Sequence, residues 1–196
     1  LHRSLERLGV DYFDLYQLHA LDDLKELDIA LSPEGAVEAI REAKDEGLVK
    51  YIGITSHKPQ TIVKALSRFD FDTVLFPLNY VLHKHRCPEN DYEPVLKLAK
   101  ERDIGTIVMK AFAKQRWQTE KHTYDTWYEP FDSQPDIDKC LWFALSQGVT
   151  TVATPGDVRL IPKVISAAER YRELTPSEQE QLIESASNLK PLFPRD

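Results

Sequence analysis

Short apolar segments alternate with amphipathic helical segments along the chain, and this alternation limits the fold to very few classes. The strand candidates are rich in β-branched and aromatic residues and largely apolar, as strands buried on both faces are. They cover residues 12–19, 51–57, 73–80, 106–112 and 150–155. Because no Asn-Gly or Asp-Gly dipeptide joins two of them, the sequence predicts crossover helices and a parallel α/β sheet.

Glycines mark where several of the intervening helices end. A glycine just past a helix supplies the left-handed turn that stops it. Polar helical stretches are followed by such a residue at Gly9, Gly47, Gly105 and Gly148.

Capping residues mark where two helices begin. Ser32-Pro33-Glu34 predicts an N-cap, a first-turn proline and an acidic first turn. Thr175 and Glu178 have the spacing of a capping box before a last helix at about residues 176–187. The residues after that helix are interpreted as a tail.

Two architectures contain such a sheet, a doubly wound open sheet and a (β/α)8 TIM barrel. The first strand candidate is not followed by the GxGxxG pattern of dinucleotide-binding open sheets. A closed barrel takes eight strands and roughly 250 residues, whereas this chain has 196 residues. Leu1 already lies within a helical pattern. We therefore expect residues 1–196 to be a single domain, an incomplete barrel with roughly three strands upstream.

The composition excludes several classes of partner. Lys and Arg number 25 and Asp and Glu number 32, which gives a net charge of −7, and an acidic surface repels nucleic-acid phosphates. No apolar run approaches the roughly 18 residues of a membrane span, so we expect neither a nucleic acid nor a membrane as partner. Cys87 and Cys140 lack CxxC spacing and predict reduced thiols in the cytoplasm.

Polar side chains stand at the end of each strand candidate. The carboxyl ends of parallel strands meet at one edge of a sheet, where sites are built. This pattern predicts one common site made from the ends of five strands, at Gln17 and His19, Thr55 to His57, Asn79 and Tyr80, Lys110, and Thr154 to Gly156.

Several of these segments carry a family resemblance. SLERLGVDYFDLYQLH at residues 4–19 and EGAVEAIREAKDEGLVKYIGITSH at residues 34–57 resemble the aldo-keto reductase family from a helix into its fourth strand and on through its fifth. FDTVLFPLNYVL, GTIVMKAFAK and VTTVATPG are similar to strands six, seven and eight. The resemblance implies the C-terminal portion of a TIM barrel.

The resemblance also implies an activity, the reduction of an aldehyde or ketone to an alcohol with NADP(H), NAD(H) remaining possible. His19 matches the family histidine that orients the substrate carbonyl. The family's proton-donating tyrosine and its lysine and aspartate come from earlier strands. Tyr16 is not a substitute, because side chains alternate along a strand and Tyr16 lies on the face opposite His19. We therefore expect negligible carbonyl reduction by these 196 residues alone.

The implied cofactor contacts lie on the later strands. Thr55 and Ser56 match the pair that binds the nicotinamide carboxamide, although Ser56 replaces an asparagine and loses its amide donor. Gly156 and Arg159 match the phosphate pocket, where an arginine fork suits a 2′-phosphate. The remaining positions that the resemblance assigns to the cofactor are Asn79, Met109 and Lys110.

Two further segments have alternative interpretations. Trp117, Trp127 and Tyr128 lie in a long loop and either wall an apolar substrate pocket or pack over the barrel exterior. His83, His85 and Cys87 offer zinc-type ligands, but three alternating residues rarely reach one tetrahedral centre. A solvated loop is favoured there, and no metal site is assigned.

Two other functions remain open. One is a cofactor-binding subunit or sensor without catalysis, which the altered nicotinamide contacts favour. The other is a metal-dependent hydrolase barrel that would use His83, His85 and Cys87 as metal ligands. The sequence indicates neither the substrate, a small carbonyl compound in the leading hypothesis, nor the oligomeric state.

Overall fold

Strands of the larger sheet pair in parallel, as the alternation of strands and helices predicts. The computed structural model describes residues 1–194. Within that range the order of the parallel strands follows the sequence, β1-β2-β3-β4-β7. A sequential order is that of a (β/α)8 barrel, whereas doubly wound sheets reverse direction at a switch point. The strands are β1 (Phe13–Leu18), β2 (Val49–Thr55), β3 (Thr73–Pro77), β4 (Gly105–Met109) and β7 (Thr151–Val152).

The chain divides into two compact units. Unit 1 contains residues 1–75 and 94–105, and unit 2 contains residues 76–93 and those from 106 onward. The chain passes from one unit to the other within β3 and at the start of β4. Among residues 1–194 no helix has the length and apolarity needed to cross a bilayer.

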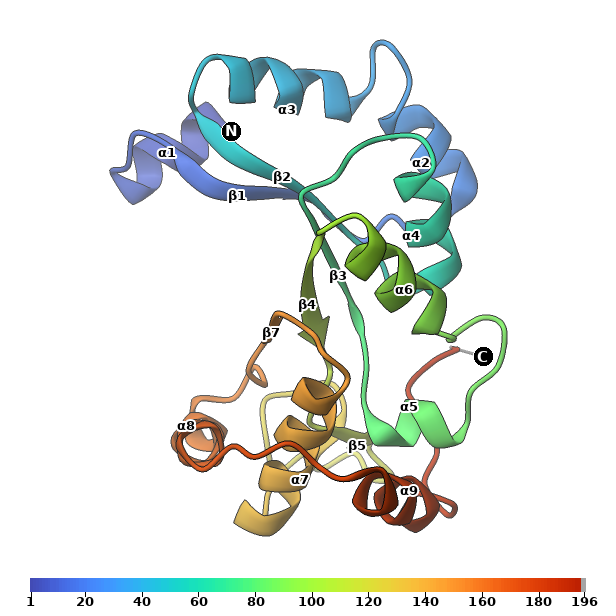
Figure 1. The fold of residues 1–196 in the computed structure, drawn as a ribbon. Coiled ribbons are helices and arrows are strands. Elements are labelled where there is room, and N and C mark those ends of the chain that lie inside the picture. The colour runs from blue at the N-terminus through green and yellow to red at the C-terminus, as the bar shows by residue number, and fades with distance from the viewer. Residues whose placement is uncertain (195–196) are drawn as a thin grey trace. The chain divides into compact units, whose positions relative to one another are not determined.

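Unit 1 is a parallel sheet with helices (Figure 1). Phe13 of β1 pairs with Val49 of β2, and Thr55 of β2 pairs with Leu75 of β3. Side chains with no exposed surface, such as Ile54 and Ile62, form its core. Its helices are α1 (His2–Leu8), α2 (Leu24–Ala30), α3 (Ala36–Asp45), α4 (Pro59–Leu66) and α6 (Glu93–Glu101), of which α6 begins at the unit boundary.

Unit 2 combines the parallel pair β4 and β7 with a small antiparallel pair. Phe143 and Ile137 of α7 are fully buried in it. Its remaining elements are α5 (Tyr80–Lys84), β5 (Ala113–Gln115), β6 (Glu129–Pro130), α7 (Gln134–Ser146), a 3₁₀ turn (Val158–Leu160), α8 (Ile161–Glu169) and α9 (Pro176–Ser185).

Three of the four predicted glycine turns are confirmed. Gly9, Gly47 and Gly148 have φ angles of 64°, 80° and 75°. The prediction for Gly105 is wrong, because Gly105 opens β4 and the left-handed residue before it is Asp103, at φ 54°. Aspartate tolerates this conformation better than most residues do, so no glycine is required at that turn.

The helix start predicted at Ser32 is also wrong. Ser32 follows the end of α2, a helix that the sequence analysis missed, and its hydroxyl donates to the carbonyl oxygen of Ile29 at 2.8 Å. The next helix, α3, begins at Ala36 with Gly35 as its N-cap. A serine hydroxyl can bond the backbone at the end of a helix as well as at its start. Ser32 therefore indicates a turn but does not show which helix end it belongs to.

The last helix begins as predicted, but the segment after it is no loose tail. Thr175 and Glu178 form the complete capping box of α9. Leu192 and Phe193, 2% and 4% exposed, join a buried cluster with Leu82, Ala113 and Tyr128.

The turn around Gly35 leads to the first testable prediction. A Cβ at this position would overlap the carbonyl oxygens of Ile29 and Ala30, and backbone atoms cannot move aside as a flexible side chain can. We expect Gly35→Ala to lower the free energy of unfolding by about 2 kcal/mol in urea titrations, a typical cost of overpacking. Glu34→Ala, in the same turn and exposed, is the control and should change it by less than about 0.5 kcal/mol. Equal stability of the two variants would contradict the prediction.

Candidate functional site

The loop after β1 crosses the carboxyl end of β2 in unit 1. His19 follows β1 directly and is exposed. The next residue, Ala20, has a left-handed φ of 53°, and its N–H donates to the Thr55 hydroxyl oxygen at 2.6 Å. The Leu21 N–H donates to the Thr55 carbonyl oxygen at 2.9 Å. The structure thus brings the loop that begins at His19 onto Thr55, at one edge of the sheet.

Ser56 has a different environment from the one the sequence predicts. Its side chain has no exposed surface. Its hydroxyl donates to Asp22 Oδ1 at 2.8 Å and accepts the Lys58 N–H at 3.0 Å. The hydroxyl is therefore engaged on both sides by the protein itself, and Ser56 secures the loop.

Asp22 clamps His57 at two points. Asp22 Oδ1 accepts the backbone N–H of His57 at 2.6 Å, and Oδ2 lies 2.8 Å from its Nδ1. Burial alone would raise the pKa of Asp22, but the hydrogen bonds from His57 and Ser56 outweigh it and hold the pKa below its ordinary value. The Asp22 carboxylate thereby orients the imidazole of His57, two residues after Thr55.

The sequence predicts His57 at a strand end but gives no prediction for Asp22. The available signal was the position of Asp22, three residues after His19 in a loop that must pass the neighbouring strand end. Only the pairing of β1 with β2 reveals that this carboxylate reaches residues 56 and 57.

In unit 2, Asn79 joins the ends of β3 and β4. Its Oδ1 accepts the Leu82 N–H at 2.7 Å as the N-cap of α5, and its Nδ2 donates to the Lys110 carbonyl oxygen at 2.8 Å. Beside this bond, the Leu78 N–H donates to the carbonyl oxygen of Met109 at 3.2 Å. Asn79 is 2% exposed, and its amide holds the backbone at Leu82 and at Lys110, of which Lys110 is a predicted position.

The Lys110 side chain lies against two of the predicted pocket residues. Its Nζ is 5.3 Å from the ring centroid of Trp127 and 5.1 Å from that of Tyr128, within the range of cation–π attraction. Lys110 itself has a left-handed φ of 61°, uncommon for a residue with a side chain. Burial raises the pKa of Tyr128 to about 12, so its phenol stays neutral at pH 7.

Trp117 does not join this aromatic wall. Its indole N–H donates to the Thr126 carbonyl oxygen at 2.7 Å, and its ring stacks on His122 with centroids 4.8 Å apart. Of the three predicted pocket residues, Trp127 and Tyr128 lie together with Lys110, and Trp117 supports the loop.

Arg159 binds a carboxylate that the sequence analysis did not consider. Its Nε donates to Asp157 Oδ1 at 2.9 Å, and its Nη2 donates to the Thr123 carbonyl oxygen at 2.9 Å. Asp157, whose side chain is 1% exposed, also accepts the Asp125 N–H at 2.9 Å. The hydrogen bonds from Arg159 and Asp125 hold the pKa of Asp157 far below its ordinary value. The pair ties the long loop to the segment that follows Gly156.

The two histidines that offer zinc-type ligands, His83 and His85, bond to different groups of the protein. His83 Nδ1 shares a 2.5 Å hydrogen bond with the Tyr92 hydroxyl, and His85 Nε2 lies 3.2 Å from the Ala186 carbonyl oxygen. Burial, with the nearby Arg86 cation, lowers the pKa of His83. Within residues 1–194 no three His, Cys, Asp or Glu side chains are grouped so that they could hold a metal ion.

Comparison with known proteins establishes the family. The model of the aldo/keto reductase family matches residues 1–186. The chain belongs to this family. Family members are oxidoreductases that act on carbonyl compounds, and this membership replaces the metal-dependent hydrolase alternative.

The relatives are longer than the part they share with this chain. An uncharacterized oxidoreductase, YqkF of Bacillus subtilis, is 31% identical over 112 residues, 57% of this chain and 32% of the relative. D-threo-aldose 1-dehydrogenase of a Pseudomonas species is 37% identical over 109 residues, 56% of this chain and 31% of the relative. The matches thus span about a third of the length of these relatives.

Solved structures share the fold. The holo form of aldo-keto reductase AKR11C1 from Bacillus halodurans superposes with a TM-score of 0.66 at 25% identity, over 94% of this chain and 64% of that chain. A Bombyx mori aldo-keto reductase in complex with NADP has a TM-score of 0.62 at 17% identity, over 93% of this chain and 60% of that chain. The second likeness concerns the fold alone.

The clamp between Asp22 and His57 gives the second prediction. A carboxylate whose pKa is lowered on folding stabilises the protein above its unfolded pKa, and this stabilisation is lost as the pH falls through the folded pKa. We expect Asp22→Asn to lower the free energy of unfolding by about 1 kcal/mol at pH 7, because charge-assisted hydrogen bonds are lost at a partly exposed site. The difference from the unchanged protein should shrink below pH 4.

Asp23→Asn is the control for this experiment, measured by the same urea titrations at pH 7 and pH 3. Asp23 caps α2 by accepting the Lys25 N–H at 2.7 Å, and asparagine caps a helix equally well. A pH-independent loss in the Asp22 variant would show that the carboxylate charge contributes nothing.

Proposed function

We propose that the protein reduces an aldehyde or ketone to an alcohol with a nicotinamide cofactor, NADP(H) in preference to NAD(H). The observation that carries the proposal is the exposed His19 at the carboxyl end of β1, in the segment that resembles the family's active-site motif. An oxidoreductase of the cytoplasm also agrees with the reduced thiols that Cys87 and Cys140 predict.

His19 serves as the group that orients the substrate. An imidazole N–H can donate a hydrogen bond to the carbonyl oxygen, which polarises the C=O bond and meets the negative charge that develops on that oxygen. The neighbouring loop is held by the bond from the Ala20 N–H to Thr55. A fixed loop keeps the imidazole oriented before the substrate arrives.

The residues expected to hold the cofactor fit it in part. Thr55 fits, because its oxygen accepts the Ala20 N–H and its hydroxyl hydrogen remains to be donated. Ser56 does not fit the carboxamide role, because it is fully buried and bound to Asp22. Arg159 fits a phosphate, since its side chain is 55% exposed although it also binds Asp157.

When bound, the nicotinamide supplies the hydride. The residues of this chain bind the cofactor and orient the substrate. Thr55 would face the carboxamide, and Arg159 with Gly156 would hold the 2′-phosphate end. Lys110, placed against Trp127 and Tyr128, would add positive charge on the side of the pocket walls. We propose that His19 and Thr55 in unit 1 serve the substrate and the carboxamide, and that Asn79, Met109, Lys110, Gly156 and Arg159 in unit 2 serve the cofactor.

A second candidate, a cofactor-binding subunit or sensor without catalysis, is favoured by one observation. The burial of Ser56 removes one of two expected nicotinamide contacts. A sensor would bind NADP(H) but turn over no carbonyl substrate in any form of the protein. Activity of the protein expressed from its full reading frame therefore separates the two candidates.

Cofactor preference is tested at Arg159. Arg159→Met removes the guanidinium that a 2′-phosphate would need, so we expect about a tenfold loss of NADPH affinity, the worth of one charge-assisted contact. NADH affinity should change by less than about twofold, because NADH has no such phosphate. Titrations that follow nicotinamide fluorescence measure both. Arg116→Met, at an exposed loop position, is the control, and an equal loss for NADH would refute a phosphate role.

The reaction is tested at His19. In the protein expressed from its full reading frame, we expect His19→Ala to lower kcat/KM for NADPH-dependent aldehyde reduction by about 100-fold, a usual effect of removing a group that acts on the reacting oxygen. Tyr12→Phe is the control and should leave the rate unchanged, since Tyr12 is exposed and precedes the amino end of β1, opposite the end that His19 follows. The 196 residues alone should show negligible NADPH oxidation, and a robust rate would mean that the chain holds its own proton donor.

A further inference from the structure

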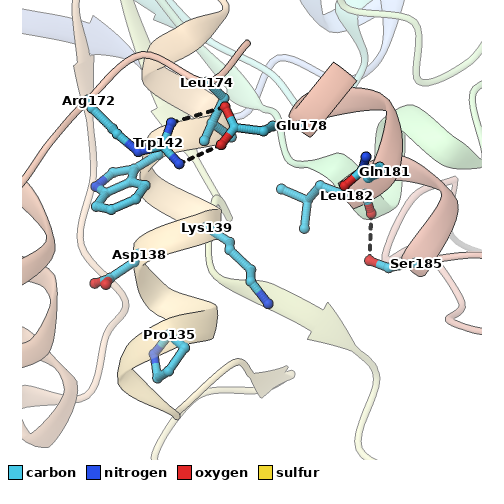
Figure 2. Close-up of a pocket in the computed structure, with 10 residues that line it drawn as sticks. All are labelled: Pro135, Asp138, Lys139, Trp142, Arg172, Leu174, Glu178, Gln181, Leu182 and Ser185. Carbon is cyan, nitrogen blue, oxygen red and sulfur yellow. Dashed lines mark hydrogen bonds and ion pairs between the residues drawn. The ribbon is translucent and has the colours of Figure 1, made fainter. Parts of the chain in front are cut away.

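Unit 2 has a cavity. Its lining includes none of the residues proposed for the substrate or the cofactor. It encloses about 440 Å³ between α7, the segment after α8, and α9. Figure 2 shows its walls, with Trp142 and Lys139 on α7 and Leu182 on α9. A volume of this size lies within the range of small-molecule sites.

The aromatic wall of the cavity is fixed by the protein. The Trp142 indole N–H donates to the Ala167 carbonyl oxygen at 2.9 Å. The Arg172 guanidinium lies 5.3 Å from the centroid of the Trp142 ring. Arg172 is itself held by Glu178, with Nη1 and Oε2 3.0 Å apart. Because protein contacts hold the ring and the guanidinium in place, a ligand would lose little free energy in positioning them.

Aliphatic side chains complete the apolar surface. Leu174 and Leu182 are 6% and 8% exposed and lie across from the indole in Figure 2. Pro135 lies at the start of α7 on the same cavity. Together they form a surface suited to a flat apolar ring.

The carboxylates that line the cavity are already neutralised. Asp138 accepts hydrogen bonds from Arg170 Nη1 and Nη2, each at 2.7 Å, and one from Gln134 at 2.7 Å. The hydrogen bonds from Arg170 keep the pKa of Asp138 below its ordinary value. Glu178 binds Arg172 and accepts the Thr175 N–H at 2.8 Å. Neither carboxylate would attract a cation into the cavity.

Lys139 is the cation on this cavity that is least compensated. Its ion pair with Asp136, one turn earlier on α7, is 3.7 Å long, and its side chain is 53% exposed. Figure 2 shows the side chain extending from α7 on the side away from Trp142. A positive charge at the side of an apolar surface is complementary to an anion that carries a ring.

We propose that this cavity is a binding site for a small aromatic carboxylate, with its ring between Trp142 and the two leucines and its carboxylate at Lys139 Nζ. The site is independent of the proposed carbonyl reduction, because it shares no residue with it. The geometry assigns each part of the ligand to a named wall.

Indole-3-acetate is the probe, with indole-3-acetamide and tryptamine as neutral and cationic ligands of the same ring. Binding is followed in ¹⁵N-labelled protein by the indole N–H resonances, and Trp142→Phe identifies that of Trp142. We expect the Trp142 signal to shift, and indole-3-acetate to bind about tenfold more tightly than either analogue at low salt. Equal affinity of the three ligands, no binding, or a shift confined to Trp117 or Trp127 would overturn the proposal.

A charge variant locates the carboxylate. Lys139→Gln should lower the affinity for indole-3-acetate about tenfold, to that of the acetamide, and leave the acetamide unaffected. Lys190→Gln, at an exposed position outside the cavity lining, is the control and should change neither affinity. If Lys139→Gln keeps the preference for the acetate, the proposal is wrong. Should that variant not fold, the ligand series on the unchanged protein decides by itself.

Discussion

Parallel pairing of the strands is the constraint from which the rest of the structure follows. A parallel neighbour can only be reached through a crossover, so parallel neighbours in the five-stranded sheet point their carboxyl ends toward the same edge. That geometry sends the loop after β1 over the end of β2 and places its backbone on Thr55. It also brings the ends of β3 and β4 close enough for Asn79 to join them.

Many polar groups at this edge first serve the protein's own backbone. Ser56 and Asp157 are almost completely buried and hold loops through hydrogen bonds that replace those lost to water. Asn79 does the same for a helix start and a strand end. His19, in contrast, is exposed. Polar residue types therefore predict where the strands end. They do not predict which of these side chains is buried and which is free of burial and able to meet a ligand.

The sequence predicts the strands and most helix ends because those features depend on local patterns. Apolar runs, left-handed glycines such as Gly47 and the capping box at Thr175 are readable within a few residues. The turn at Ser32 was misplaced because serine suits both the end of one helix and the start of the next. The antiparallel pair β5 and β6 was missed because a long loop, without a short turn signal, separates its strands.

The candidate site required partners distant in sequence. Asp22 meets Ser56 across 34 residues, and Arg159 meets Thr123 across 36. No local pattern encodes such contacts. The association of Lys110 with Trp127 and Tyr128 likewise depends on how the loop folds back on β4.

The aromatic wall beside Lys110 has support from outside the region common to the family. The family match ends at residue 186, whereas Leu192 and Phe193 pack with Tyr128, and the rings of Phe193 and Trp127 lie 6.3 Å apart. Substitutions in this terminal segment can therefore reshape the surroundings of Lys110, which follows β4, without altering any family motif. The shape of that wall can therefore differ among relatives through residues that lie beyond the part matched by the family model.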